Sequence, residues 1–406
     1  MRWGRSAIPL APLVVAIISC RGGSDRGPET VRVARVQTGD DAVARRGADA
    51  TPSKVSSFPA LQIAPAFTGV CVLLRGEVRC ARPSEDDWSD LRALRRVDGL
   101  PDPVRVTSMS PIFACALGRA GRVHCFGANF AGELGAGLRD DMHDAPVQVP
   151  GVEQAIDLAV GEHHTCALVA DGGVMCWGQN AYGQTSDDVV YDDRVRELVH
   201  PVRVPGVRDA IAVAVTSTSS CALTRASKVI CWGLALHDGA NDDRRSEVPE
   251  VVPAAEGISV LFGGGGAFCG LRRGDALCWG HVPPVDDAEA NARDPRRREP
   301  HVVKLPGTPQ KIALGNGLGC ALLGDSRVAC WGSEFGGALG SQREENAWTH
   351  DVRLVPGIAR ATDVFAGGGA ACALTRSSGL LCWGSWKPER WGDSKAMAEP
   401  RTVRFD

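Results

Sequence analysis

The chain has 406 residues, and its 45 Lys and Arg nearly balance 48 Asp and Glu, giving a formal net charge of -3. This balance argues against nucleic acid or an anionic membrane surface as the main partner. Charged residues make up 23% and apolar residues 44%, which excludes a disordered chain, and 48 Gly beside 10 Phe and 2 Tyr favour many short strands over a helical bundle.

The N-terminus has the features of an export signal. Two arginines precede a largely apolar stretch at 7–18 that is too short to span a bilayer. It ends in IISC (17–20), which resembles the lipobox of bacterial lipoproteins. In that family the signal is cut before the cysteine, which then carries lipid. The resemblance implies a signal peptide at 1–19 and a lipidated Cys20, with the protein anchored in the bacterial cell envelope and facing the periplasm or the exterior. An ordinary secretory signal is the alternative, and it also predicts export.

Residues 20–57 are polar, small and without periodicity, so we expect a flexible tether between the lipid and a folded domain at 58–406. One segment of the tether, TVRVARV at 30–36, alternates like a strand. It could instead close the fold against the last repeat.

The remaining cysteines form seven pairs, each spaced nine or ten residues apart. The pairs recur about every 50 residues, a period typical of propellers and solenoids. They are Cys71 and Cys80, Cys115 and Cys125, Cys166 and Cys176, Cys221 and Cys231, Cys269 and Cys278, Cys320 and Cys330, and Cys372 and Cys382.

Each cysteine pair encloses an apolar alternation broken by a turn signal, such as Arg75-Gly76 or Ala170-Asp171-Gly172, which predicts a β-hairpin. Cysteines placed symmetrically about the turn face each other across the ladder, about 4.5–5.5 Å apart at Cα, within reach of a disulfide. We therefore expect seven cross-strand disulfides, because disulfides persist outside the cytosol. Reduced core cysteines are the alternative, and the spacing does not fit a metal site.

Two further strands frame each hairpin. Upstream segments such as AIDLAVG (155–161) are rich in small residues, as expected near a narrow axis, and downstream segments such as HPVRVPG (200–206) begin with Pro, as expected of an edge strand. Four strands in each of seven units predict an all-β, seven-bladed β-propeller of four-stranded antiparallel blades. The tryptophans that follow the second cysteine are expected to pack between blades: Trp177, Trp232, Trp279, Trp331 and Trp383.

The order V-P-G, apolar strand, C-A-L, turn, C-W-G, N-x-x-G-Q resembles the regulator of chromosome condensation repeat, most clearly at 121–135 and 161–184. The resemblance covers about residues 58–406 and implies the same propeller. The first unit departs most, since Ala81 replaces the aromatic residue, and one copy keeps the family's histidine, at His164. Eukaryotic members exchange nucleotide on a small GTPase and bind chromatin, and predicted export separates this chain from both.

The connections between the C-W-G strand and the Pro-led strand are long and differ in every unit, while the strands repeat. Because they leave every blade at the same end, they predict a recognition surface for an unidentified protein partner. Aromatic residues on these loops are the candidate contacts, although each can instead pack against its own loop. They are Trp88, Phe130, Tyr182, Tyr191, Phe335, Trp348, Trp386 and Trp391.

No catalytic, cofactor or metal constellation is predicted. The close pair His163-His164 points to opposite faces of a strand. Gly263 to Gly266 lacks the Lys-Ser/Thr of a phosphate loop. Acidic pairs lack the D-x-D-x-D-G pattern of a calcium loop, and we interpret them, with one basic run, as solvated loops. These are Asp187-Asp188, Asp192-Asp193, Asp242-Asp243, Asp286-Asp287 and Arg296 to Arg298.

The sequence therefore predicts an exported, lipid-anchored propeller that binds a protein partner through long loops on one face. It predicts no nucleic acid partner and membrane contact only through the lipid. A hydrolase or lyase with an acidic central mouth and a purely structural envelope protein are the alternatives. A close group of carboxylates or histidines with shifted pKa at one mouth would favour the enzyme, and scattered charges would favour binding.

Overall fold

The structure is a computed structural model in which these residues are described: 61–66, 69–81, 94–109, 112–185, 197–234, 245–280, 299–334, 337–340, 348–377, 379–385 and 397–403. All of them belong to one compact unit, residues 48–406. Within this part of the chain the elements are strands, apart from one 3-10 turn at Pro253–Ala255, in agreement with the all-β prediction.

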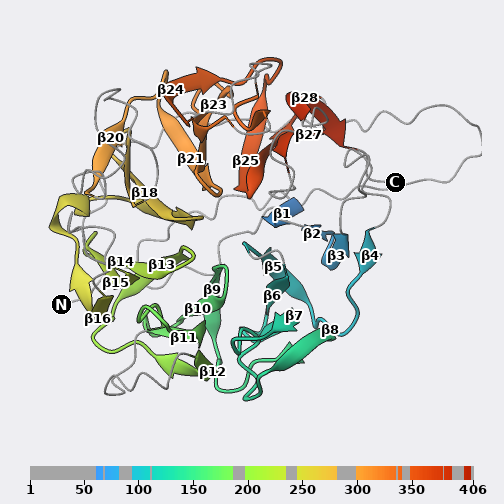
Figure 1. The fold of residues 1–406 in the computed structure, drawn as a ribbon, viewed down its shortest axis with the longest axis vertical. Helices are drawn as coiled ribbons and strands as arrows, with labels where there is room; N and C mark the ends of the chain where they lie inside the picture. The colour runs from blue at the N-terminus through green and yellow to red at the C-terminus, as the bar shows by residue number, and fades with distance from the viewer. Residues whose placement is uncertain are drawn as a thin grey trace, which may run out of the picture. The chain divides into compact units, whose positions relative to one another are not determined.

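The strands form seven antiparallel sheets of four, each built from four consecutive strands (Figure 1). The first strands are β1 (Leu61–Ala66), β5 (Pro103–Thr107), β9 (Ala155–Val160), β13 (Ala210–Val215), β17 (Val260–Gly264), β21 (Pro309–Leu314) and β25 (Ala361–Gly367). The second strands are β2 (Gly69–Leu74), β6 (Phe113–Gly118), β10 (His164–Val169), β14 (Ser219–Thr224), β18 (Ala267–Arg272), β22 (Leu318–Leu323) and β26 (Gly369–Thr375).

The third strands are β3 (Glu77–Ala81), β7 (Val123–Asn129), β11 (Val174–Gln179), β15 (Val229–Leu234), β19 (Asp275–Gly280), β23 (Val328–Ser333) and β27 (Gly379–Ser385). The fourth strands are β4 (Arg95–Arg96), β8 (Asp140–Gln148), β12 (Glu197–Arg203), β16 (Arg245–Val251), β20 (His301–Val303), β24 (Trp348–Leu354) and β28 (Met397–Val403). We number the sheets as blades 1 to 7 in chain order. The architecture is the predicted seven-bladed propeller.

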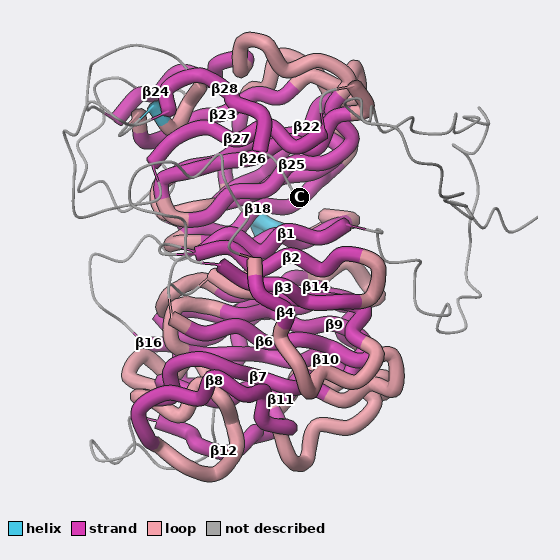
Figure 2. The backbone as a smooth tube through the Cα atoms, turned by 90° about the vertical axis from the view of Figure 1, so that its right-hand side faces the viewer, coloured by secondary structure: helices cyan, strands magenta, loops and turns pink. Residues whose placement is uncertain are grey.

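The first strands are innermost, where β1 lies next to both β5 and β25 and so completes the ring (Figures 1 and 2). The last blade takes its outer strand from the C-terminal segment, because β28 pairs with β27. The alternative strand at 30–36 lies outside the described residues. Ring closure within the described chain rests on side-chain packing, since Ile63 and Val72 of blade 1 share one buried cluster with Phe365 and Leu380 of blade 7.

Every interface between neighbouring blades has a buried apolar cluster of its own. The cluster around Trp177, for example, joins Phe113 and Leu117 of blade 2 to Leu158 and Ala167 of blade 3. All five C-W-G tryptophans are almost completely buried, which confirms their predicted place between blades. Blade 2 has Phe126 in place of the tryptophan, at its interface with blade 1. Blade 1 has Ala81 at this position, and its interface with blade 7 is formed around Phe365 and aliphatic side chains.

All seven predicted disulfides are present, each across its own hairpin. In every blade the two cysteines are direct partners in the register of the second and third strands, as Cys166 and Cys176 are in blade 3. Their Cα atoms lie 4.0 to 4.2 Å apart. Twelve of the fourteen are deeply buried, whereas Cys71 is at the edge of burial and Cys80 is partly exposed.

The C-W-G sequence requires glycine at its third position for steric reasons. Gly178 has φ +99°, and a Cβ there would lie 2.5 Å from the carbonyl oxygen of His163 in the turn between β9 and β10. The register between β11 and β12 shifts between Cys176 and Gly178. The same conformation and close approach recur at Gly127, Gly233, Gly280, Gly332 and Gly384.

Candidate protein-binding face

In each antiparallel blade, the turn between the first and second strands and the connection between the third and fourth strands leave from the same end. We call this end the long-loop face, and the opposite end, with the turn between second and third strands, the hairpin face. The connection between β7 and β8 is described throughout and consists of residues 130–139, because β8 begins at Asp140. We call it the blade 2 loop.

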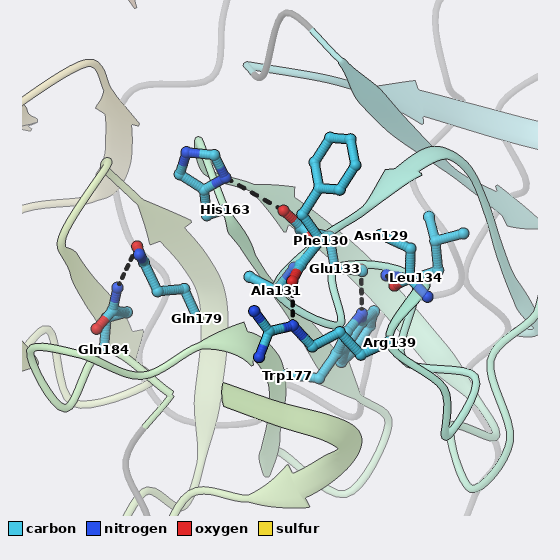
Figure 3. A network of polar contacts seen from close by, with 10 residues as sticks. All are labelled: Asn129, Phe130, Ala131, Glu133, Leu134, Arg139, His163, Trp177, Gln179 and Gln184. Carbon is cyan, nitrogen blue, oxygen red and sulfur yellow. Dashed lines mark hydrogen bonds and ion pairs between the residues drawn. The ribbon is translucent and has the colours of Figure 1, made fainter. Parts of the chain in front are cut away.

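The blade 2 loop is folded around the side chain of Asn129 (Figure 3). The Asn129 amide donates to the carbonyl of Leu138 at 3.0 Å, and its Oδ1 accepts the backbone N–H of Leu134 at 3.1 Å. Glu133 Oε2 accepts the N–H of Ala131 at 2.7 Å. The loop backbone is therefore fixed from within by two side chains of the N-x-x-G-E sequence.

The same fold recurs in blade 3, where Asn180 Oδ1 accepts the N–H of Thr185 at 3.1 Å and Gln184 Oε1 accepts the N–H of Tyr182 at 2.8 Å. In blade 6 the asparagine is replaced by Glu334, which is buried and paired with Arg353 at 2.6 Å. The repeat motif seen in the sequence is thus a loop-folding device.

Three of these loops are tied to the next blade by its buried tryptophan. Trp177 Nε1 donates to the carbonyl of Glu133 at 2.8 Å, and Trp232 Nε1 donates to that of Gln184 at 2.9 Å. Trp383 Nε1 donates to Ala338 O at 3.0 Å. The indoles of Trp279 and Trp331 are equally buried, but their N–H groups have no partner among the described residues. The loops after β15 and β19, which correspond to these two tryptophans, lack the Asn motif in the sequence and lie largely outside the described residues.

His163 lies in the turn before β10, and His164 is the first residue of that strand. His163 Nδ1 lies 3.1 Å from Oε1 of the fully buried Glu133, and this hydrogen bond raises the pKa of His163. His164 is buried between blades, where Nε2 lies 2.9 Å from Ser220 Oγ, and burial lowers its pKa to about 3. The two imidazoles therefore share no site. Sequence reasoning missed the partner of His163, because blade packing alone brings Glu133 beside it.

The predicted contact aromatics have different places. Phe130, in the blade 2 loop, is 48% exposed. Tyr182 is half-buried against the cluster between blades 4 and 5, so it packs instead of projecting. Trp348 is the first residue of β24, and its side chain is not described. The others lie outside the described residues: Trp88, Tyr191, Phe335, Trp386 and Trp391.

Phe130 is accompanied by a second exposed apolar side chain, because Leu138, at the other end of the loop, is 60% exposed. Arg139 joins the two ends by donating to Phe130 O at 2.6 Å and pairing with Glu197 of blade 3 at 2.7 Å. Gly137 N–H also bonds Val199 O at 2.9 Å. The loop therefore presents apolar side chains from a backbone anchored on two blades.

The innermost strands offer no close group of carboxylates. Their two acidic residues, Asp157 and Asp363, each form an ion pair with a cation of a neighbouring blade, Arg105 and Lys311 respectively. At the long-loop end, Gly265 N–H contacts Met109 Sδ at 3.0 Å, so Met109 reaches from blade 2 to blade 5. The run Gly263 to Gly266 lies in and after β17, on the innermost strand as expected.

Other polar candidates contribute little. No group of three or more metal-ligating side chains is found among the described residues. The acidic pairs at 187–188, 192–193, 242–243 and 286–287 and the arginines at 296–298 lie outside them. Within the same residues, no helix has the length and apolarity that crossing a membrane requires.

Comparison with known proteins gives a consistent result. Residues 120–168 and 155–184 match models of the Regulator of chromosome condensation (RCC1) repeat. Protein pim1 of Schizosaccharomyces pombe is 29% identical over 202 residues, covering 43% of this chain and 37% of pim1. RCC1 domain-containing protein RUG3, mitochondrial, of Arabidopsis thaliana is 25% identical over 324 residues, covering 76% of this chain and 72% of RUG3.

Among solved structures, yeast RCC1 (Prp20), seen with Kap60 bound, has a TM-score of 0.62 at 17% identity, covering 77% of this chain and 78% of that one. At this identity the likeness shows the fold alone. The fold is consistent with a protein-binding module. The repeat matches, the seven blades and the recurring loop motif together support an RCC1-type repeat family for this chain.

Proposed function

We propose that this protein is an exported, lipid-anchored propeller that binds a protein partner through its long-loop face. The observation that carries the proposal is the pair of exposed apolar side chains, Phe130 and Leu138, held on a loop fixed by Asn129 and Arg139. A rigid apolar contact loses little conformational entropy on binding, which is why such residues dominate the affinity of many interfaces.

Export and anchoring are supported by the N-terminal sequence and by the disulfides. Seven disulfides are typical of proteins outside the reducing cytosol. Cys20 follows the predicted signal directly, and residues 21–57 would let the propeller stand away from the membrane. Binding by yeast Prp20 of Kap60 is an example of a related fold engaged by a protein.

The anchor is tested by changing Cys20→Ala. We expect the variant to move from the membrane fraction to the soluble envelope fraction, because a thioether-linked lipid can no longer form. Mass spectrometry of the wild-type N-terminal peptide should show Cys20 as the first residue with lipid attached. An unlipidated chain that begins elsewhere would show that the alternative, an ordinary secretory signal, is correct.

The binding face is tested by Phe130→Ala and Leu138→Ala after the partner has been identified by proximity labelling in intact envelopes. We expect each variant to weaken the partner's affinity by about 10- to 100-fold, since removal of a central apolar contact costs about 1.4–2.8 kcal/mol. Ile211→Ala is the matched control, because Ile211 is also exposed but begins its innermost strand near the hairpin face. Equal weakening by the control, or no loss with Phe130→Ala, would contradict the proposal.

A further inference from the structure

Besides its bonds to Trp177, Val199 and Glu197, the blade 2 loop contacts blade 3 through a titratable pair, whereas the equivalent side chain of the blade 3 loop contacts a neutral group of its own blade. Glu133 and Gln184 occupy the same place in the repeat, and each accepts the backbone N–H two residues earlier. The remaining side-chain atom of Gln184 donates to Gln179 Oε1 at 3.3 Å. The remaining oxygen of Glu133 instead contacts the imidazole of His163 (Figure 3). Blade 2 thus has a carboxylate at the position where blade 3 has an amide.

The burial of Glu133 gives the replacement of an amide by a carboxylate an energetic consequence. The Glu133 side chain is 0% exposed, while the His163 side chain is 36% exposed and lies in the turn between β9 and β10. A buried carboxylate is costly unless a cation or several donors satisfy it. Its donors are the N–H of Ala131 and the imidazole of His163. The protonated imidazole supplies a positive charge directly beside this carboxylate.

Both carboxylates near His163 raise its pKa. The hydrogen bond with Glu133 raises the pKa of His163 most, burial opposes it, and the charges of Glu133 and Glu162 raise it further. The adjacent turn of blade 4, residues 216–218, contributes hydroxyl groups and no charge. The stabilisation is therefore fully present below pH 6.5, the ordinary pKa of imidazole, and is lost as the pH rises through the raised value.

We propose that the His163–Glu133 contact is a pH-dependent latch that strengthens the attachment of the blade 2 loop to blade 3 when the imidazole is protonated and weakens it when the imidazole is neutral. A weaker attachment would loosen the backbone from which Phe130 and Leu138 project. The functional consequence, stronger partner binding below neutral pH, rests on the proposed function. The loop motion itself does not.

The free energy of global unfolding does not isolate this latch, because the pH dependence contributed by His164 has the opposite sign. Burial, and then the charge of His163, lower the pKa of His164 to about 3, so its contribution is present above pH 6.5 and is lost as the pH falls from there. A local measurement on the loop is needed. His164 is unchanged in both variants described below.

The test is hydrogen exchange by mass spectrometry on the full chain at pH about 5.5 and about 8.5, with correction for intrinsic exchange. In wild type we expect protection of residues 130–139 to be about three- to tenfold higher at the lower pH, since a charge-assisted bond is replaced by a neutral one. Residues 180–185 of blade 3, held by Gln184, are the internal control and should not respond. Glu133→Gln and His163→Gln should each abolish the response of the blade 2 loop.

A second readout separates the latch from a merely structural role. Proton NMR of the imidazole should show His163 titrating above 6.5 in wild type and closer to 6.5 in Glu133→Gln. A wild-type loop whose protection does not change with pH, or a Glu133→Gln variant that keeps the wild-type response, would overturn the latch. If the latch is observed but Phe130→Ala leaves partner affinity intact, the proposed function fails and the latch stands.

Discussion

Replacing Cys166 and Cys176 together by Ala is expected to lower the free energy of unfolding by about 3 kcal/mol or more. Closing a loop of about ten residues restricts the unfolded chain by about 2.5–3 kcal/mol in the chain-entropy model, and loss of buried sulfur adds to this. Both cysteines are 0% exposed. Denaturant unfolding, followed by circular dichroism and extrapolated to water, measures the change.

The matched control is the double replacement of Cys71 and Cys80 by Ala. It opens a loop of nearly the same length, with a sequence separation of 9 against 10, but Cys80 is partly exposed. We expect a smaller loss of unfolding free energy, close to the entropic contribution of loop closure alone. An unchanged unfolding midpoint for the blade 3 variant, or free thiols in the purified wild type, would contradict this account of the blades.

The second large effect concerns the tryptophans between blades. Trp177→Phe should cost about 2–4 kcal/mol of folding free energy, because it removes part of a buried ring and leaves the Glu133 carbonyl without its 2.8 Å donor. Trp279→Phe removes the same ring volume, together with an N–H that has no partner among the described residues. We expect it to cost about 1–2 kcal/mol less than Trp177→Phe, since an unpaired buried donor is itself destabilising.

Each of the two kinds of tryptophan, with and without a hydrogen-bonded indole, has a second member that serves as a control. Trp232→Phe should follow Trp177→Phe, because its indole donates to Gln184 O in the same way, and Trp331→Phe should follow Trp279→Phe. Thermal unfolding of the four variants in one buffer makes the comparison. Four equal losses would mean that the hydrogen bond to the neighbouring loop does not contribute, and that ring packing alone holds the blades.

Individual loop residues show what a local sequence pattern can and cannot predict about exposure. Phe130 directly follows the loop asparagine of blade 2, Tyr182 lies two residues after that of blade 3, and both are predicted contact residues. Phe130 is exposed, whereas Tyr182 packs against the cluster of the next two blades. The burial of Tyr182 depends on packing against those blades, which its own loop sequence does not reveal. The same holds for Glu133, whose partner is 30 residues away.

The sequence by itself determined the repeating unit, the seven disulfides, the buried tryptophans and the four-stranded blade. These features depend on short-range order: alternation, turn residues and the spacing of two cysteines recur within about fifty residues, so each copy supports the others. Only the tertiary structure decided which loop side chains are exposed, which indoles are hydrogen-bonded, how the ring closes between β1 and β25, and that His163 meets a buried carboxylate. Those facts depend on contacts between different blades, and such contacts exist only once the sheets have packed around a common axis.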